Sequence, residues 1–117
     1  MLYSLTRSLK CRQVGQVQMN ISVNGTAATP VASGPDAAFI QSITDGGAGL
    51  YTINLKEPAK IAPFVSGIVA LTADVIPHVV AVTTSSITVQ FNDAAGAAAD
   101  ADFNIQFQFS EQLSYYF

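Results

Sequence analysis

The stretch Ala101-Asp102-Phe103-Asn104-Ile105-Gln106-Phe107-Gln108-Phe109 decides the fold class of this chain. Apolar and polar residues alternate from Phe103 to Phe109, which is the period of a strand with one buried and one outward face. The large side chains at the odd positions are therefore expected to enter one core. The outward face carries Asn104, Gln106, Gln108 and Ser110. Uncharged groups of this kind cost less to desolvate than charges, so the face can meet water or another protein.

Similar short runs, rich in Val, Ile, Thr, Phe and Tyr, recur along the chain between Gly, Pro, Asn and Asp residues. Two runs, 64–72 and 75–83, are almost continuously apolar, which predicts that both of their faces are covered. Turns are predicted at Asn24-Gly25, at 45–49 and at 93–102. The expected strands are Gln16 to Val23, Phe39 to Thr44, Leu50 to Leu55, Phe64 to Thr72, Val75 to Thr83, Ser86 to Asn92 and Phe103 to Phe109, with a short edge strand near Val31 and a strand or arm over Leu2 to Leu9.

Eight to nine strands with frequent turns predict an all-β protein, an antiparallel sandwich or small barrel. No window of about a dozen residues has the 3.6-residue periodicity of an amphipathic helix. A chain of 117 residues suits one domain with a core of its own. We therefore predict a single antiparallel β-sandwich over residues 1–117, in which residues 1–15 form an extended arm or an edge strand.

The composition favours a surface that is covered in an assembly. Half of the residues are hydrophobic and 11% are charged, against about a quarter charged in an average soluble domain. Oligomerisation or docking on a larger particle would cover such a surface; the alternative is that its many alanines lie on the surface at little cost. The net charge is −3, and Arg7, Lys10 and Arg12 hold three of the five basic charges. This basic segment is either an ordinary solvated arm or a contact for an acidic neighbour, and it is too sparse to predict nucleic-acid binding.

No signal for export or membrane insertion is present. Residues 1–15 lack the apolar run of a signal peptide. The longest apolar stretch, Ile61 to Leu71, is interrupted by Pro63 and Gly67 and is too short to span a bilayer. Cys11 is the only cysteine, so no disulfide can form within one chain, which fits a reducing compartment.

No constellation of residues predicts an enzyme. His78 is the only histidine and follows Pro77 within an expected strand, where packing against neighbours is the simpler interpretation. Asp93, Asp100 and Asp102 could offer oxygens to calcium, but their spacing matches no calcium loop and aspartates are common in turns. The Gly-rich segment 45–49 lacks the Lys and Ser/Thr of a phosphate loop, and Glu57 and Glu111 do not suggest paired catalytic carboxylates. We expect no catalysis, no cofactor and no metal.

The segment Leu113-Ser114-Tyr115-Tyr116-Phe117 contains three aromatic residues in succession. Such a segment costs solubility unless it packs on something, either this chain's own sandwich or a neighbouring subunit.

From Gly47 to Phe109 the layout resembles the small jelly-roll modules of tailed-bacteriophage virion proteins. The resemblance rests on a Gly-rich turn that leads into Gly49-Leu50-Tyr51-Thr52-Ile53, on a Ser/Thr-rich strand over Ser85 to Asp93, and on Ala-Asp-x-Asp-Phe at Ala99 to Phe103. Residues 1–44 do not match these modules.

The resemblance implies a jelly-roll-like fold and a non-enzymatic structural protein of the virion. It favours a trimeric capsid decoration, or cement, protein that binds the major capsid protein, assembled in the host cytoplasm. The alternative is the receptor- or carbohydrate-binding knob of a head or tail fibre. No nucleic acid or membrane is expected as a partner. The candidate partner-binding residues are Arg7, Lys10, Arg12, Asn104, Gln106, Gln108, Tyr115, Tyr116 and Phe117.

Overall fold

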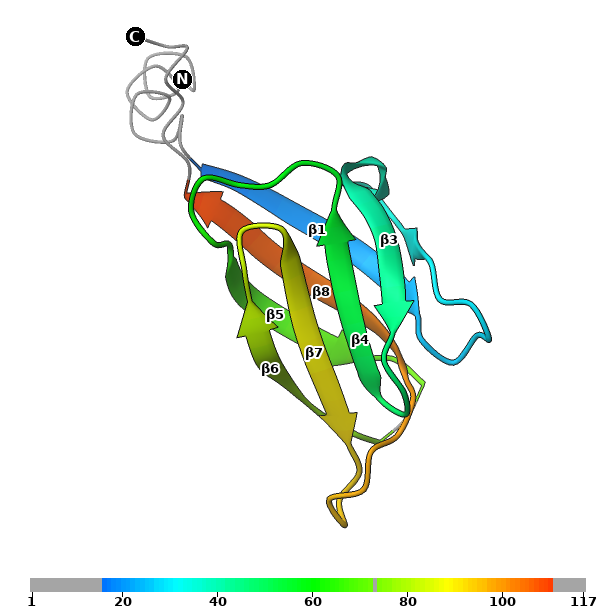
Figure 1. Cartoon of the computed structure of the whole chain (residues 1–117). Coiled ribbons are helices and arrows are strands. Elements are labelled where there is room, and N and C mark those ends of the chain that lie inside the picture. The colour runs from blue at the N-terminus through cyan, green and yellow to red at the C-terminus, as the bar shows by residue number, and fades with distance from the viewer. Residues whose placement is uncertain (1–15, 73, 111–117) are drawn as a thin grey trace, which may run out of the picture.

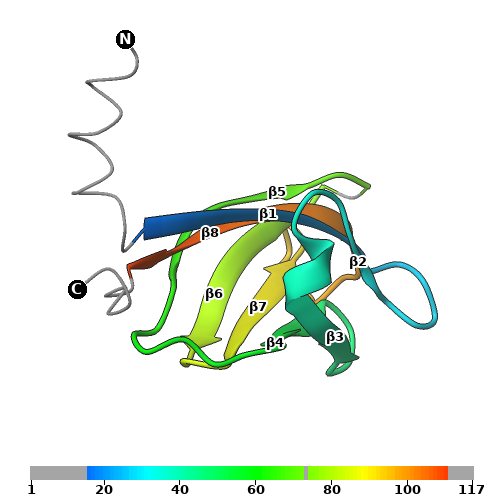
Figure 2. The same cartoon turned by 90° about the horizontal axis from the view of Figure 1, so that it is seen from above.

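The computed structural model describes residues 16–72 and 74–110, which form two antiparallel four-stranded sheets packed face to face (Figures 1 and 2). The predicted all-β sandwich is therefore confirmed. In these ranges the helical structure is a single three-residue 3₁₀ turn, η1, and no helix there has the length to cross a membrane. The strands are β1 (Gln16–Asn24), β2 (Ala32–Ser33), β3 (Ile40–Asp45), β4 (Leu50–Leu55), β5 (Phe64–Ala70), β6 (Ile76–Val82), β7 (Ser86–Asn92) and β8 (Asp102–Ser110), and η1 spans Ala37–Phe39.

In each sheet, strands that are far apart in the sequence lie next to each other. One sheet has the order β2-β1-β8-β5 and the other β3-β4-β7-β6. The first long strand, β1, thus pairs with the last, β8, along its whole length, and β4 pairs with β7 in the opposite sheet. The connections from β2 to β3, from β4 to β5, from β5 to β6 and from β7 to β8 cross from one sheet to the other, which makes the sandwich jelly-roll-like.

The core lies between the sheets and is built from the alternate residues that the sequence periodicity predicts. Tyr51, Phe91 and Phe103 form an aromatic cluster with ring centroids 4.7–5.9 Å apart. The core of the described ranges is one cluster of buried side chains: Met19, Ile21, Val23, Ile40, Tyr51, Ile53, Leu55, Ile87, Val89, Phe91, Ala101, Phe103, Ile105, Phe107 and Phe109.

The predicted turns at Asn24-Gly25 and at 45–49 both form, but they use glycine differently. At the β3–β4 hairpin, the Gly46 amide donates to the Leu50 carbonyl at 2.9 Å, and Gly47 has a φ of 121°, which favours glycine. After β1, the Ala27 amide donates to the Asn24 carbonyl at 3.0 Å. Gly25 in that turn has no positive φ and is buried, so space rather than conformation calls for glycine there.

The predicted covering of both faces of 64–72 and 75–83 is wrong for the described chain. Both runs do form strands, β5 and β6, but each lies at an edge of its sheet. Their side chains are mostly exposed or half-buried; Phe64 is 66% exposed and Val80 is 55% exposed. Their continuous apolar pattern therefore describes a surface of this chain, not its core.

Candidate interaction surfaces

The aspartates considered for calcium brace loops instead. Asp93 Oδ1 accepts hydrogen bonds from the Ala95 and Ala97 amides, both at 2.9 Å. Asp102 Oδ1 accepts two hydrogen bonds from Thr26, one from the backbone amide at 3.0 Å and one from the side-chain hydroxyl at 2.8 Å. Within residues 16–72 and 74–110, no group of three or more His, Cys, Asp or Glu residues is placed to hold a metal.

The remaining candidates for chemistry are dispersed. His78 lies in β6 as expected, paired across the sheet with Gln90, and its side chain is exposed rather than packed among neighbours. Glu57 is exposed in the loop that follows β4. Cys11 and Glu111 lie outside the described residues.

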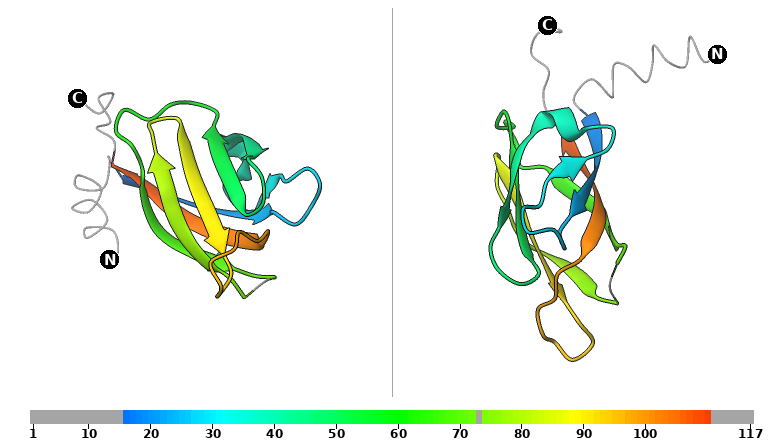
Figure 3. Two further views of the ribbon diagram at one scale, coloured as in Figure 1. Left: turned by 60° about the horizontal axis from the view of Figure 1, so that its bottom comes forward. Right: turned by 90° about the vertical axis from the view of Figure 1, so that its right-hand side faces the viewer.

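Tyr51 is the most elaborately hydrogen-bonded side chain of the core. Its hydroxyl proton has two acceptors in reach, the Gly25 carbonyl at 2.8 Å and Asp100 Oδ1 at 3.0 Å. The hydroxyl oxygen accepts from the Ala101 amide at 3.3 Å. Asp100 Oδ1 also accepts from the Gly49 amide at 2.7 Å. This network ties β4 to the turn after β1 and to the loop before β8, the loop that projects beyond the sheets in Figure 3.

Burial raises the pKa of the Tyr51 phenol well above its ordinary value of about 10, and the Asp100 carboxylate raises it further, while the Ala101 amide acts in the opposite direction. The folded state therefore holds the neutral phenol. The neutral phenol therefore contributes to the free energy of unfolding. This contribution is fully present below pH 10, the ordinary pKa of the phenol in the unfolded chain, and is lost as the pH rises from there through the raised pKa of the folded state.

We expect Tyr51→Phe to lower the free energy of unfolding by about 1–3 kcal/mol at neutral pH, since it leaves the Gly25 carbonyl and Ala101 amide without this partner. Above pH 10 the gap between the two proteins should narrow by up to about 1.4 kcal/mol per pH unit. Urea denaturation of both proteins at pH 7 and at several values above pH 10 measures this. A gap that stays constant with pH would show that the phenol does not remain neutral in the fold.

The outward residues of β1 and β8 form a polar surface, the amide face, defined by Gln18, Asn20, Ser22, Asn104, Gln106 and Gln108. These residues pair directly across the two strands, Gln18 with Gln108, Asn20 with Gln106 and Ser22 with Asn104. The Ser22 hydroxyl donates to Asn104 Oδ1 at 2.5 Å. The outward placement predicted for residues 104, 106 and 108 is thus confirmed, and their role in partner binding stays a prediction.

A groove of about 280 Å³ crosses the amide face. Pro35, Gly67 and Val69 line it, and a Cβ at Gly67 would meet nothing within 4 Å. The full lining is Asn20, Ile21, Ser22, Pro35, Gly67, Val69, Asn104, Ile105 and Gln106.

The second surface is an apolar edge, where β5 and β6 end their respective sheets. Val79 lies opposite core residue Val89 on β7, yet it is 41% exposed, because the sandwich is open along this edge. In the sequence from Ile61 to Val82 the only charged residue is Asp74. The apolar edge is defined by its exposed large side chains, Ile61, Phe64, Val69, Leu71, Ile76, Val79 and Val80.

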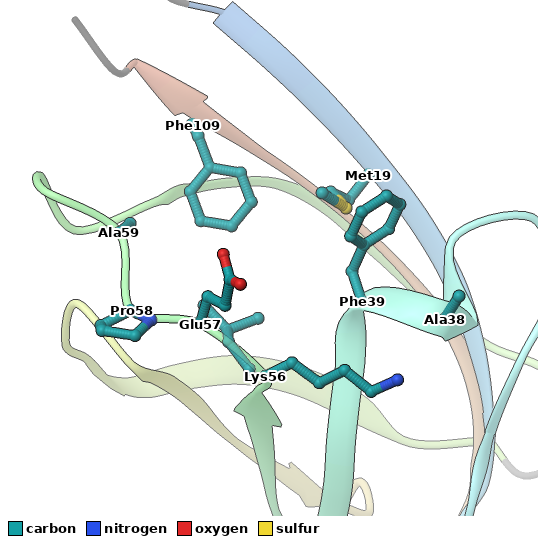
Figure 4. Close-up of a pocket in the computed structure, with 9 residues that line it drawn as sticks. Met19, Ala38, Phe39, Lys56, Glu57, Pro58, Ala59 and Phe109 are labelled. Carbon is teal, nitrogen blue, oxygen red and sulfur yellow. The ribbon is translucent and has the colours of Figure 1, made fainter. Parts of the chain in front are cut away.

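The third surface is an end pocket of about 610 Å³ at the end of the sandwich where β8 finishes (Figure 4). Its apolar part comes from Met19, Leu55 and Phe109, which are nearly buried, and from Phe39, which is 55% exposed. The Lys56 amide donates to the Phe39 carbonyl at 3.0 Å and fixes the loop after β4 against η1. The full lining is Met19, Ala38, Phe39, Leu55, Lys56, Glu57, Pro58, Ala59 and Phe109.

Sequence reasoning missed the end pocket. The alternating pattern of β1 and β8 predicts that Met19 and Phe109 lie on the buried faces of these strands. It does not predict that Phe39 and the loop 56–59 line the same pocket. The other partner-binding candidates, Arg7, Lys10, Arg12, Tyr115, Tyr116 and Phe117, lie outside the described residues.

Comparison with known proteins adds no relative. No protein-family model, no curated protein and no solved structure matches this chain.

Proposed function

We propose that this chain is a non-enzymatic structural subunit that assembles with copies of itself, as a trimeric decoration protein on a phage capsid. The observation that carries the self-assembly is the apolar edge. It presents exposed large apolar side chains from a stretch, 61–82, in which Asp74 is the only charged residue. Exposed apolar side chains gathered along one edge of a sandwich are typical of a surface that another protein covers.

The edge strands favour packing of side chains over addition of a strand. Register shifts interrupt β5 between Val65 and Gly67 and β6 between Val79 and Ala81. Pro77 in β6 has no amide hydrogen to donate. Bulges and proline are the means by which edge strands avoid indiscriminate pairing. A second copy would therefore bury the apolar side chains of this edge without extending either sheet.

The amide face continues directly from the apolar edge. Phe64 in β5 pairs with Gln108 in β8, and Val69 pairs with Asn104. One contact could therefore have an apolar centre on β5 and a hydrogen-bonding border on β8, the arrangement common to protein interfaces. In this proposal the basic segment Arg7, Lys10 and Arg12 or the aromatic residues Tyr115, Tyr116 and Phe117 attach the trimer to the major capsid protein. Many weak contacts of this kind act together when a trimer binds.

The mass in solution tests the assembly. One chain has a mass of 12.3 kDa, so a trimer should have three times this mass, about 37 kDa, in light scattering after size-exclusion chromatography. Ile76→Lys and Val80→Lys introduce charges at exposed positions of the apolar edge. We expect each to shift the population towards monomer, since a desolvated, unpaired charge disfavours the contact.

Ala28→Lys is the matched control. Ala28 is exposed in the loop between β1 and β2, at the opposite edge of that sheet from β5, so the same charge there should leave the mass unchanged. A wild-type protein that stays monomeric at micromolar concentration contradicts the assembly.

The capsid role is tested by cosedimentation of the wild-type trimer with undecorated phage heads. We expect the trimer to sediment with the heads, and we expect Arg7→Ala and Lys10→Ala to reduce the amount bound. A trimer that does not sediment with the heads would contradict the capsid role and leave only the self-association.

A further inference from the structure

We propose that the end pocket is a docking site for the aromatic segment Leu113–Phe117 of the same chain. This inference is independent of the assembly proposed above, because the end pocket is lined by residues other than those of the apolar edge on β5 and β6. It rests on the chemistry of the pocket, its position and the reach of the chain.

The pocket has the chemistry of an aromatic-residue site. Phe109 and Met19 reach it from β8 and β1, and Phe39 reaches it from η1, so its inner surface is apolar (Figure 4). Its volume of about 610 Å³ lies within the range of about 300–1,000 Å³ of pockets that enclose small ligands. Rings of Tyr or Phe, which each bury about 150–250 Å² when packed, fit such a surface.

The pocket also offers a polar group that suits tyrosine. The Glu57 carboxylate points towards Phe109 among the residues that line the pocket, whereas the Lys56 side chain points away from them (Figure 4). A carboxylate at the mouth of an apolar pocket accepts a hydrogen bond from a phenol whose ring lies inside. Tyr115 and Tyr116 each combine these two properties, and Phe117 adds a fully apolar ring.

The position of the pocket favours the chain's own segment over that of another copy. Phe109, which lines the pocket, is followed by Ser110, where β8 ends. Tyr115 lies five residues beyond Ser110, so it can be as far as roughly 17 Å from the end of β8. A short tether of this kind gives an effective concentration in the millimolar range, which a second copy in dilute solution does not reach.

Photo-crosslinking tests the inference in the full-length protein. Tyr116 is replaced by p-benzoylphenylalanine, and equal amounts of isotopically light and heavy chains are unfolded, mixed and refolded together, so that any oligomer contains both. The sample is irradiated and the products are mapped by mass spectrometry. We expect cross-links from position 116 to Met19 or to residues 56–59, and we expect them to join light to light and heavy to heavy chains.

Two substitutions separate this pocket from the apolar edge. Phe39→Asp removes an exposed aromatic wall of the pocket and should lower the yield at least about tenfold, the loss typical of removing an anchor residue. Phe64→Asp changes an exposed phenylalanine of the apolar edge and should leave the yield unchanged. Cross-links that join light to heavy chains, that avoid the pocket, or that persist in Phe39→Asp would each overturn the inference.

Discussion

Replacing Phe103 with alanine should lower the free energy of unfolding by about 3–5 kcal/mol, the cost of removing a buried aromatic side chain and leaving a cavity. Phe103 is fully buried, and its ring lies 4.7 Å from that of Phe91 and 5.4 Å from that of Tyr51, measured between centroids. A domain of this size has a total stability of about 5–15 kcal/mol, so the variant loses a large part of it.

The measurement is urea denaturation followed by circular dichroism, with Phe39→Ala as the control. Phe39→Ala removes the same atoms from a side chain that is 55% exposed, and it should cost less than half as much. Equal losses for the two variants would show that Phe103 does not occupy the centre of the core.

Gly25→Ala should be the second most damaging of the changes considered. A Cβ at position 25 would overlap the Ala101 carbonyl oxygen and would lie 2.6 Å from Tyr51 Cζ. Overpacking of this kind costs about 1–3 kcal/mol. Relief of the overlap with the Ala101 carbonyl requires the backbone to move, and the close contact with the Tyr51 ring displaces that side chain as well. Either movement weakens the buried hydrogen bonds of the Tyr51 hydroxyl, for a further ~1–3 kcal/mol.

Gly67→Ala is the matched control for this change. A Cβ at Gly67 meets nothing within 4 Å, and Gly67 has no positive φ. Alanine there should leave the free energy of unfolding within about 1 kcal/mol of the wild-type value, or raise it slightly, because glycine loses more conformational entropy on folding. If both alanine variants unfold at the same urea concentration, the tight packing of Gly25 against Tyr51 and Ala101 is not present in solution.

The periodicity of the sequence determined the strands and the faces of the central ones. Leu50–Leu55, Ser86–Asn92 and the stretch from Phe103 to Phe109 were predicted closely, and their inward residues are the buried ones. A period of two specifies which side chains share a face, because successive residues of a strand point to opposite sides. It does so most clearly for central strands, where one face meets the core and the other does not.

The tertiary structure alone decided which strands are neighbours and which lie at an edge. The apolar sequences of β5 and β6 predict strands with both faces buried. Both strands lie at the edges of their sheets, and many of their apolar side chains are exposed. Strand pairing joins residues far apart in the chain, as Gln18 and Gln108 are, and no local pattern encodes the partner.

The same reason explains the missed contacts. Tyr51, Gly25 and Asp100 meet through hydrogen bonds that span 26 and 49 residues of sequence, and the end pocket gathers Met19, Phe39 and Phe109 from separate elements. The local sequence specifies which face of a strand is buried, because apolar and polar side chains alternate. Pockets and exposed edges depend on the order in which the strands pair, which brings segments far apart in the sequence together.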